Sequence, residues 1–186
     1  RTNALLEIAN TLNSHSDFKQ VAEDVIERAI NLVGADYGAL GVLDETGKRI
    51  SLATFKSAEG IKLGKMLKLI EQYNKSLEIE TFSALGDLLR DGKTLRLADS
   101  QLPFAIRIFF NTQLRGKAAL VTPVHVAGRA FGLLGFVWSK ESTFADHDIA
   151  LIEGIADQIG TALERDQLST EVMRLKSVLH QRHEIV

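Results

Sequence analysis

Few of the residues that could do chemistry stand at the spacings that known catalytic sites require. The chain has no cysteine, which excludes disulfides, thiolate metal sites, a cysteine nucleophile and thioether attachment of a cofactor. It also lacks the Gly-x-Ser-x-Gly, His-Glu-x-x-His, Gly-x-Gly-x-x-Gly and P-loop patterns of hydrolases, zinc proteases and nucleotide-binding enzymes. We therefore expect a protein that is not an enzyme and has no catalytic residues.

Two groups of side chains have the residue types of a metal site. Asp-His-Asp stands at 146–148, and His180 and His183 lie three positions apart. A zinc site needs several such ligands held together in a fixed geometry. Asp146, however, has the spacing of a helix-capping pair with Thr143, and the two histidines fall on a charged helical segment. We expect no metal site.

Basic side chains are the other candidates for binding. Lys62, Lys65 and Lys68 recur every three residues, which is typical of the solvated face of a helix. Arg107 and Arg115 flank an apolar segment and would supply the few polar anchors that a ligand pocket uses. The net charge of −2 is not the basic surface that nucleic acids or anionic membranes attract. We expect no direct nucleic-acid or membrane contact in this fragment.

The elements that must position these residues follow from hydrophobic periodicity. Apolar residues recurring every three or four positions predict helices over 4–12, 18–33, 59–75 and 84–92, and a long one from Asp146 onward. Apolar runs bounded by turn signals predict strands at 36–44, 49–55, 94–99, 118–126 and 130–138. Residues 100–115 have no clean period and predict a long apolar connection that is either functional or packed as a lid, with phenylalanines that either belong to the core or line a pocket. This order predicts an α+β domain with an antiparallel sheet.

The segment 114–139 carries four glycines but is predicted to be scaffold. Its two apolar runs are joined by Ala-Gly-Arg, which predicts a hairpin. Gly132 and Gly135 indicate a close approach of the backbone or a bend in the strand. No helix begins directly after these glycines, so they do not form a phosphate-binding turn.

The C-terminal helix carries two apolar stripes that are out of phase with each other, with the slip between Ala162 and Leu168. The second stripe has heptad spacing and continues beyond any plausible domain edge. We therefore predict a homodimer through the terminal helices. The candidate residues of this dimer and signalling helix are Ile152, Ile155, Ile159, Leu168, Val172, Leu175 and Leu179.

The chain begins with Arg1 and ends within a helical pattern, and it has neither a signal peptide nor an apolar run long enough to span a membrane. We expect a cytoplasmic fragment of a longer protein.

The second half of the chain reads RGKAALVTPVHVAGRAFGLLGFVWS, followed by FADHDIALIEGIADQIGTALERDQL. This order of features resembles the GAF domain of signalling proteins, and the opening helices and first hairpin are similar to those of the same family, so that the resemblance covers about residues 4–167. Within the family, DYGALGVLD and LLRDGKTLRLAD are most like bacterial sensor histidine kinases. The matching positions are Pro123, Gly128, Gly132, Phe144, Asp146, Leu151, Ala156, Gln158, Ile159 and Ala162.

The resemblance implies a six-stranded antiparallel sheet with helices on both faces and a long C-terminal signalling helix. It places the opening helices and this long helix on one face, and a small-molecule pocket on the other, under the middle helices. The candidate pocket residues that it implies are Tyr37, Met66, Ile70, Phe104, Arg107, Phe109, Phe110, Leu114 and Arg115.

The resemblance leaves the cofactor unknown. Haem-binding relatives carry a proximal histidine just before the strand that begins near Ala118, and here that loop, FFNTQLRGK, has none. His125 lies within the strand, where a lone histidine is more often structural. Attachment of a bilin, and the chemistry of the free methionine sulfoxide reductases that share this fold, both depend on cysteine.

A cyclic nucleotide lacks support as a ligand. The Asn-Lys and Asp-Glu pairs of cyclic-nucleotide-binding GAF domains are replaced by Ser139-Lys140 and Asp148-Ile149. Phe144 and Asp148 also have ordinary explanations, as packing at the start of a helix and a favourable charge near its N-terminus.

The predicted function is therefore a regulatory module that senses a small molecule, dimerises and relays the ligand state through its terminal helices. We expect a GAF sensor domain over 1–167 and a coiled-coil linker over 168–186. The linker would lead to a histidine kinase core or to the AAA+ domain of a transcription activator, since its sequence resembles both linkers. The competing interpretation is a ligand-free GAF scaffold for dimerisation and protein interaction.

Overall fold

The computed structural model describes residues 18–64, 68, 77–78, 83–97, 101–102, 104–141 and 144–185. The strands are β1 (Tyr37–Leu43), β2 (Arg49–Ser57), β3 (Leu77–Glu78), β4 (Leu95–Leu97), β5 (Ala118–Val126) and β6 (Arg129–Trp138). The helices are α2 (Phe18–Val33), α4 (Ser83–Asp91), α5 (Phe104–Thr112) and α6 (Asp146–Ile185).

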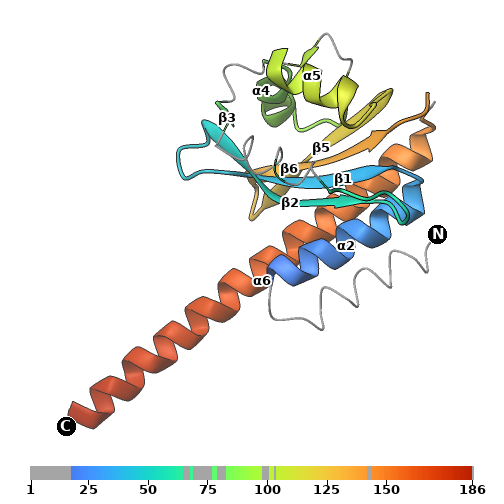
Figure 1. Ribbon diagram of the computed structural model, residues 1–186. Coiled ribbons are helices and arrows are strands. Elements are labelled where there is room, and N and C mark those ends of the chain that lie inside the picture. Colours follow the sequence, from blue (N-terminus) through green and yellow to red (C-terminus); the bar gives the residue numbers. More distant parts are fainter. Residues whose placement is uncertain are drawn as a thin grey trace.

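The strands form a six-stranded sheet in the order β3-β2-β1-β6-β5-β4, in which every neighbouring pair is antiparallel. Helices α2 and α6 lie side by side on one face of the sheet, and α4 and α5 lie on the other (Figure 1). The predicted α+β class, the six-stranded sheet and the helices on both faces are confirmed.

Two predicted elements differ from the structure. Residues 59–64, the start of the helix predicted over 59–75, form turns and a stretch without regular secondary structure. Gly60 and Gly64 there have φ of +88° and +41°, which interrupt a right-handed helix. The rest of that prediction lies outside the described residues, except for Lys68, which is helical. The helix predicted over 4–12 also lies outside them.

The second difference is α5, which occupies most of the predicted loop at 100–115. Its sequence, FAIRIFFNT, is apolar on nearly every side, and this hides the helical period. In the structure Phe110 is buried while Ile108 remains 45% exposed, so the helix does have an inner face. The lid-like placement over the sheet is as predicted, but the lid is helical.

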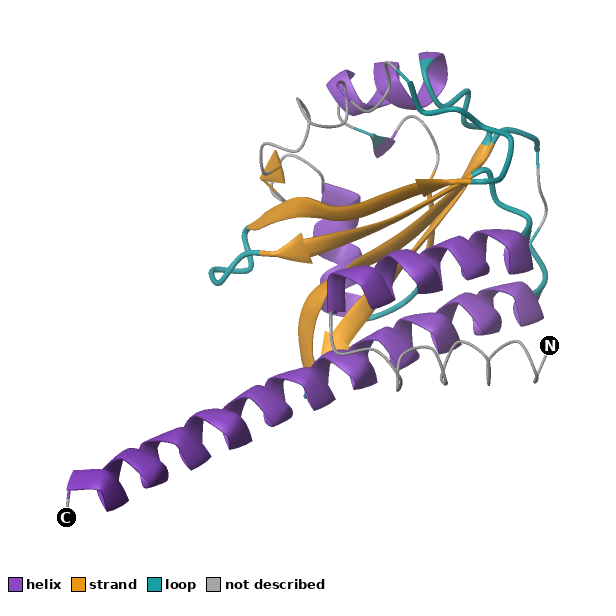
Figure 2. Ribbon diagram, turned by 60° about the horizontal axis from the view of Figure 1, so that its bottom comes forward, coloured by secondary structure: helices purple, strands orange, loops and turns teal. Residues whose placement is uncertain are grey.

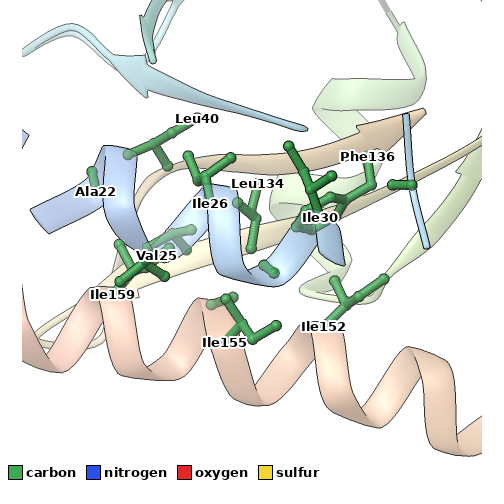
Figure 3. Packing of buried hydrophobic residues seen from close by; sticks show 14 of the residues in the cluster. Ala22, Val25, Ile26, Ile30, Leu40, Leu134, Phe136, Ile152, Ile155 and Ile159 are labelled. Carbon is green, nitrogen blue, oxygen red and sulfur yellow. The ribbon is translucent and has the colours of Figure 1, made fainter. Parts of the chain in front are cut away.

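The main core lies between the sheet and helices α2 and α6. Val25, Ile26 and Ile30 of α2 face Ile152 and other isoleucines of α6, with sheet residues between and above them (Figure 3). All of these side chains have at most 1% of their surface exposed. Periodic apolar residues on the two helices thus form one continuous interior with the sheet.

Trp138, at the end of β6, joins three elements around the start of α6. Its Nε1 donates a hydrogen bond of 3.3 Å to the carbonyl of Val33 at the end of α2. Its ring packs against Phe144 with centroids 4.7 Å apart. On the other side of Phe144, the Arg96 guanidinium of β4 lies 5.3 Å from the ring centroid, and its Nη2 donates to the Phe144 carbonyl at 2.7 Å. The packing expected for Phe144 is therefore present.

Helix α6 begins at Asp146 and continues for 40 residues, far beyond the sheet (Figure 2). The carboxylate of Asp148 accepts a hydrogen bond of 3.2 Å from the backbone N–H of Ala145, which fixes the first turn. The predicted capping pair was Thr143 with Asp146; Thr143 lies outside the described residues, and the bond at the first turn is made by Asp148. None of the helices in the described part of the chain is both long and apolar enough to cross a membrane.

Candidate functional site

A cavity of about 280 Å³ lies on the face of the sheet that α4 and α5 cover. It is bordered by strands β1, β2, β4, β5 and β6, by both helices and by the segments just before and after α5. Every described residue that lines it is apolar. These residues are Ala39, Gly41, Leu52, Leu85, Leu97, Leu102, Phe109, Phe110, Leu114, Ala119, Val121, Leu133, Gly135, Phe136 and Val137.

The floor of the cavity is built from small residues on central strands. Side chains alternate between the two faces of a strand, so Ala39 and Gly41 face the cavity while Leu40 between them enters the main core. In β5 and β6, Ala119 and Gly135 occupy equivalent positions. A Cβ added to Gly135 would meet no atom closer than 3.7 Å. Gly135 therefore leaves space that a larger residue would fill, whereas at Gly41 the side chain of Ile50 already takes the space, 2.9 Å from the place of a Cβ.

The roof of the cavity is the C-terminal half of α5. The backbone N–H of Gly116 donates a hydrogen bond of 2.8 Å to the carbonyl of Phe110, and Leu114 bonds back to Phe109 at 3.1 Å. The Phe110 ring occupies the place of a side chain at Gly116, where a Cβ would lie 2.3 Å from it. Arg115 takes a left-handed φ of +51° to make this turn. The turn therefore fixes the aromatic roof against β5.

Three of the nine predicted pocket residues line the cavity: Phe109, Phe110 and Leu114. Met66 and Ile70 lie outside the described residues. Phe104 is the first residue of α5, but its side chain is not among the described ones. The remaining three predicted residues are polar and lie around the cavity.

Tyr37 is buried on the cavity face of β1, two positions before Ala39, and its ring packs against Phe55 with centroids 5.7 Å apart. Burial raises the pKa of its hydroxyl above 10.0; the charge of Asp36 adds to the rise in pKa and that of Arg115 opposes it. Arg107 donates a hydrogen bond of 3.0 Å from Nη2 to the carbonyl of Leu102 and so holds a lining residue in place. Arg115 is exposed.

The sheet residues that line the cavity were not predicted from the sequence. They are the four small floor residues and larger ones such as Val121, Leu133 and Val137. The sequence pattern that could have indicated this floor is the alternation of small and large residues in ALGV, KAALV and LLGFV. Gly132 was correctly predicted to mark a close approach, because a Cβ there would lie 2.0 Å from the Gly41 carbonyl oxygen. Gly135 instead forms part of the cavity floor.

Strand β4 connects the cavity to α6. Leu97 lines the cavity, whereas Arg96 reaches Phe144 in front of α6. Just before the strand, the hydroxyl of Thr94 lies 2.8 Å from Oε1 of Glu153 on α6 and 3.0 Å from the hydroxyl of Thr122 on β5. One short strand thus contacts the candidate site on one side and the first turns of the long helix on the other.

A second contact joins α6 to the sheet at a bulge in β5. A Cβ on Gly160 of α6 would lie 2.2 Å from the carbonyl oxygen of His125, so the helix backbone rests directly on the strand. The imidazole of His125 is exposed. Among the described residues, no group of three or more histidine, aspartate or glutamate side chains is placed to hold a metal ion.

The two stripes of α6 have different surroundings. The first stripe, Ile152, Ile155 and Ile159, is fully buried within the chain's own core. The second stripe lies beyond the sheet, and its members are 48–60% exposed. These exposed residues are Leu168, Val172, Leu175 and Leu179. Of the predicted dimer residues, only this second set is accessible to a partner.

Comparisons with known proteins agree with this geometry. Residues 15–164 match the family model of the GAF domain. The sequence is 23% identical over 181 residues to the sensor histidine kinase YhcY of Bacillus subtilis (strain 168), an alignment that covers 97% of this chain and 46% of that protein. The chain therefore spans less than half the length of this curated relative.

Solved structures with the same fold include a GAF domain/HD domain protein from Geobacter sulfurreducens, with a TM-score of 0.67 and 19% identity over 84% of this chain and 98% of that chain. The phycoerythrobilin-bound GAF domain of a cyanobacterial phytochrome has a TM-score of 0.70 and 13% identity, covering 91% of this chain and 97% of that one. At these identities the likeness shows the fold.

Proposed function

The chain belongs to the GAF domain family, a family of regulatory and sensory modules, and on that premise we propose that it is the small-molecule sensor of a signalling protein. A ligand in the cavity changes how α4, α5 and β4 pack against the sheet. Helix α6 carries this change to an output domain.

The observation that carries the proposal is the double contact of β4. A ligand that touches Leu97 presses on a strand of only three residues at the edge of the sheet. The opposite side of that strand holds the start of α6 through the bond from Arg96 to Phe144, and Thr94 bonds to Glu153 about two turns into the helix. The input and the output therefore share one short edge strand, so a ligand that prefers one packing of this strand would bias the start of α6.

Dimerisation is the second part of the proposal. The exposed stripe of α6 repeats with heptad spacing, and a second copy of the chain presents the same stripe. Two such helices would pair beyond the domain, where the residues between Ala162 and Leu168 change phase. A change of packing at the first turns of α6 would then alter the register of the pair.

The output domain is proposed to be a histidine kinase core, because the curated relative is a sensor histidine kinase that extends well beyond the matching region. The AAA+ domain of a transcription activator is the alternative. A ligand-free dimerisation scaffold is the competing function, and the exposed stripe of α6 by itself favours it equally.

Native mass spectrometry and a thermal-shift screen of small molecules test the sensor and the dimer separately. We expect a dimer that either carries a small-molecule adduct from its host or gains thermal stability with a member of the screen. Ligand binding should also change hydrogen exchange of residues 144–163. A dimer that carries no adduct and responds to no compound would support the scaffold and overturn the sensor.

Two matched substitutions on α6 test the dimer surface. Leu175→Glu places a charge within the exposed stripe and should give a monomer. Met173→Glu places the same charge on an exposed residue outside the stripe and should leave the dimer intact. Equal effects of the two substitutions, or a monomeric wild-type chain, would contradict pairing through this stripe.

A further inference from the structure

We propose that the ligand of this cavity is an uncharged and largely hydrocarbon molecule of about ten carbon atoms, such as a fused-ring aromatic compound. This inference rests on the proposed function, because it names the chemical class that the sensor site accepts. It is drawn from the lining, the surrounding charges and the size of the cavity.

The lining offers almost nothing that could recognise a polar group. Its described side chains are all apolar. The backbone of the floor is also occupied, since Ala39 pairs with Gly135 across β1 and β6, and Gly135 pairs with Val121 across β6 and β5. Backbone N–H and C=O groups in the interior of a sheet are already bonded to neighbouring strands. A polar ligand atom against this floor would lose its water and find no partner.

The arginines closest in sequence to the cavity lining are directed elsewhere. Arg107 donates to the carbonyl of Leu102, within the protein. Arg96 follows the alternation of β4 to the opposite face and binds the Phe144 carbonyl there. Arg115 is exposed in the turn after α5. A carboxylate or phosphate inside the cavity would have to draw Arg96 or Arg107 away from these bonds to be compensated, and a buried charge without a partner is far more costly than a buried neutral group.

The size and shape of the cavity favour a flat or chain-like hydrocarbon. An apolar cavity of roughly 150 Å³ stays dry and holds one benzene ring. The present cavity of about 280 Å³ has close to twice that volume. The small floor residues Ala39, Ala119 and Gly135 and the aromatic residues Phe109 and Phe110 of the roof line the same cavity. Two fused rings match its volume and can gain aromatic contacts with the roof.

Three probes test the ligand class: naphthalene, its carboxylate 2-naphthoate, and cyclic GMP. We expect naphthalene to bind and to raise the melting temperature. The naphthoate should bind at least ~100-fold more weakly, because it adds a buried charge to the same ring system. Cyclic GMP should show no measurable binding. Fluorescence titration measures the affinity of each probe for the purified chain, and thermal shift measures the change in its melting temperature.

Leucine substitutions at two alanine positions locate the binding site. Ala119→Leu fills the cavity from its floor and should reduce naphthalene affinity by ~10-fold or more. Ala130→Leu makes the same change at an exposed position of β6 and should leave the affinity unchanged. If Ala119→Leu does not fold, Gly135→Ala replaces it, since its Cβ has room at 3.7 Å from the nearest atom. Equal naphthalene affinity in the cavity variant and the wild type would overturn the inference.

Different results would contradict the hydrocarbon ligand class and the sensor function. Preferential binding of 2-naphthoate or cyclic GMP overturns the hydrocarbon class and leaves a small-molecule sensor. Absence of binding by all three probes overturns the hydrocarbon class as well. The sensor then survives only if native mass spectrometry or the wider screen finds a different ligand.

Discussion

Comparison of the two faces of the sheet shows how the same strands serve two purposes. On the face toward α2 and α6, Leu40, Leu120 and Leu134 are fully buried and meet closely packed side chains from both helices. On the face toward α4 and α5, the neighbouring positions Ala39 and Ala119 border an unfilled cavity. The filled face provides stability, and the hollow face can therefore leave room for a ligand.

The free space beside Gly38 and Gly135 also differs between the two faces of the sheet. A Cβ on Gly38 would lie 2.9–3.1 Å from Ile26, Ile30 and Phe136, because the main core has already filled that space. A Cβ on Gly135 would meet nothing closer than 3.7 Å. The strand face at Gly135 is thus more loosely packed than that at Gly38, although the cavity face also has tight positions, since a Cβ on Gly41 would lie 2.9 Å from Ile50.

The largest expected difference in stability between the two faces is between alanine substitutions at two adjacent leucines of β6. Leu134→Ala removes a side chain from the packed core and should cost about 3–5 kcal/mol of unfolding free energy. Leu133→Ala removes one that already borders the cavity, and it should cost about 2 kcal/mol. Urea denaturation of both variants measures the difference. Equal losses would mean that the cavity face is packed as tightly as the core.

A smaller effect is expected from alanine at the two glycines. Gly38→Ala forces three core side chains to shift and should destabilise the chain by about 1–3 kcal/mol. Gly135→Ala should be neutral or stabilise it by about 0.5 kcal/mol, since it restricts the unfolded chain without a clash. Thermal unfolding compares the pair. A loss at Gly135 as large as that at Gly38 would show that the floor has no free space.

Much of the fold could be predicted because its signals are local. Helix α2 and the two hairpins follow from the periods of residues close together in the chain. Helix α5 could not be predicted in this way, because FAIRIFF is apolar on nearly every side apart from Arg107, and its inner face is decided by what it packs against. In the same way, the turn at 59–64 replaced the predicted helix where two glycines adopt positive φ.

The candidate site was less predictable because it depends on pairs far apart in the sequence. The small residues Ala39 and Gly135 form one floor only because the register of β1 and β6 places them opposite each other. The bond between Thr94 and Glu153 joins residues 59 positions apart. Periodicity indicates which face of a strand a residue occupies, but it does not indicate its neighbour on the next strand.

The smallest expected effect is a shift in the titration of the Tyr37 hydroxyl, which reports whether water reaches the cavity face of β1. The chain has two tyrosines, so the difference between the ultraviolet pH titrations of the wild type and Tyr37→Phe reports this hydroxyl. We expect its midpoint above 10.0, because burial, with the nearby charge of Asp36, raises the pKa of Tyr37.

The sign of this shift in pKa also sets the pH dependence of stability. The folded chain holds the Tyr37 proton more tightly than the unfolded chain does. The stabilisation is therefore fully present below pH 10.0 and is lost as the pH rises through the folded pKa of Tyr37. Tyr37→Phe should remove this part of the alkaline loss of stability. A midpoint at or below 10.0 would instead show that water reaches the cavity face at β1, and the hollow would then be an open groove suited to polar ligands as well.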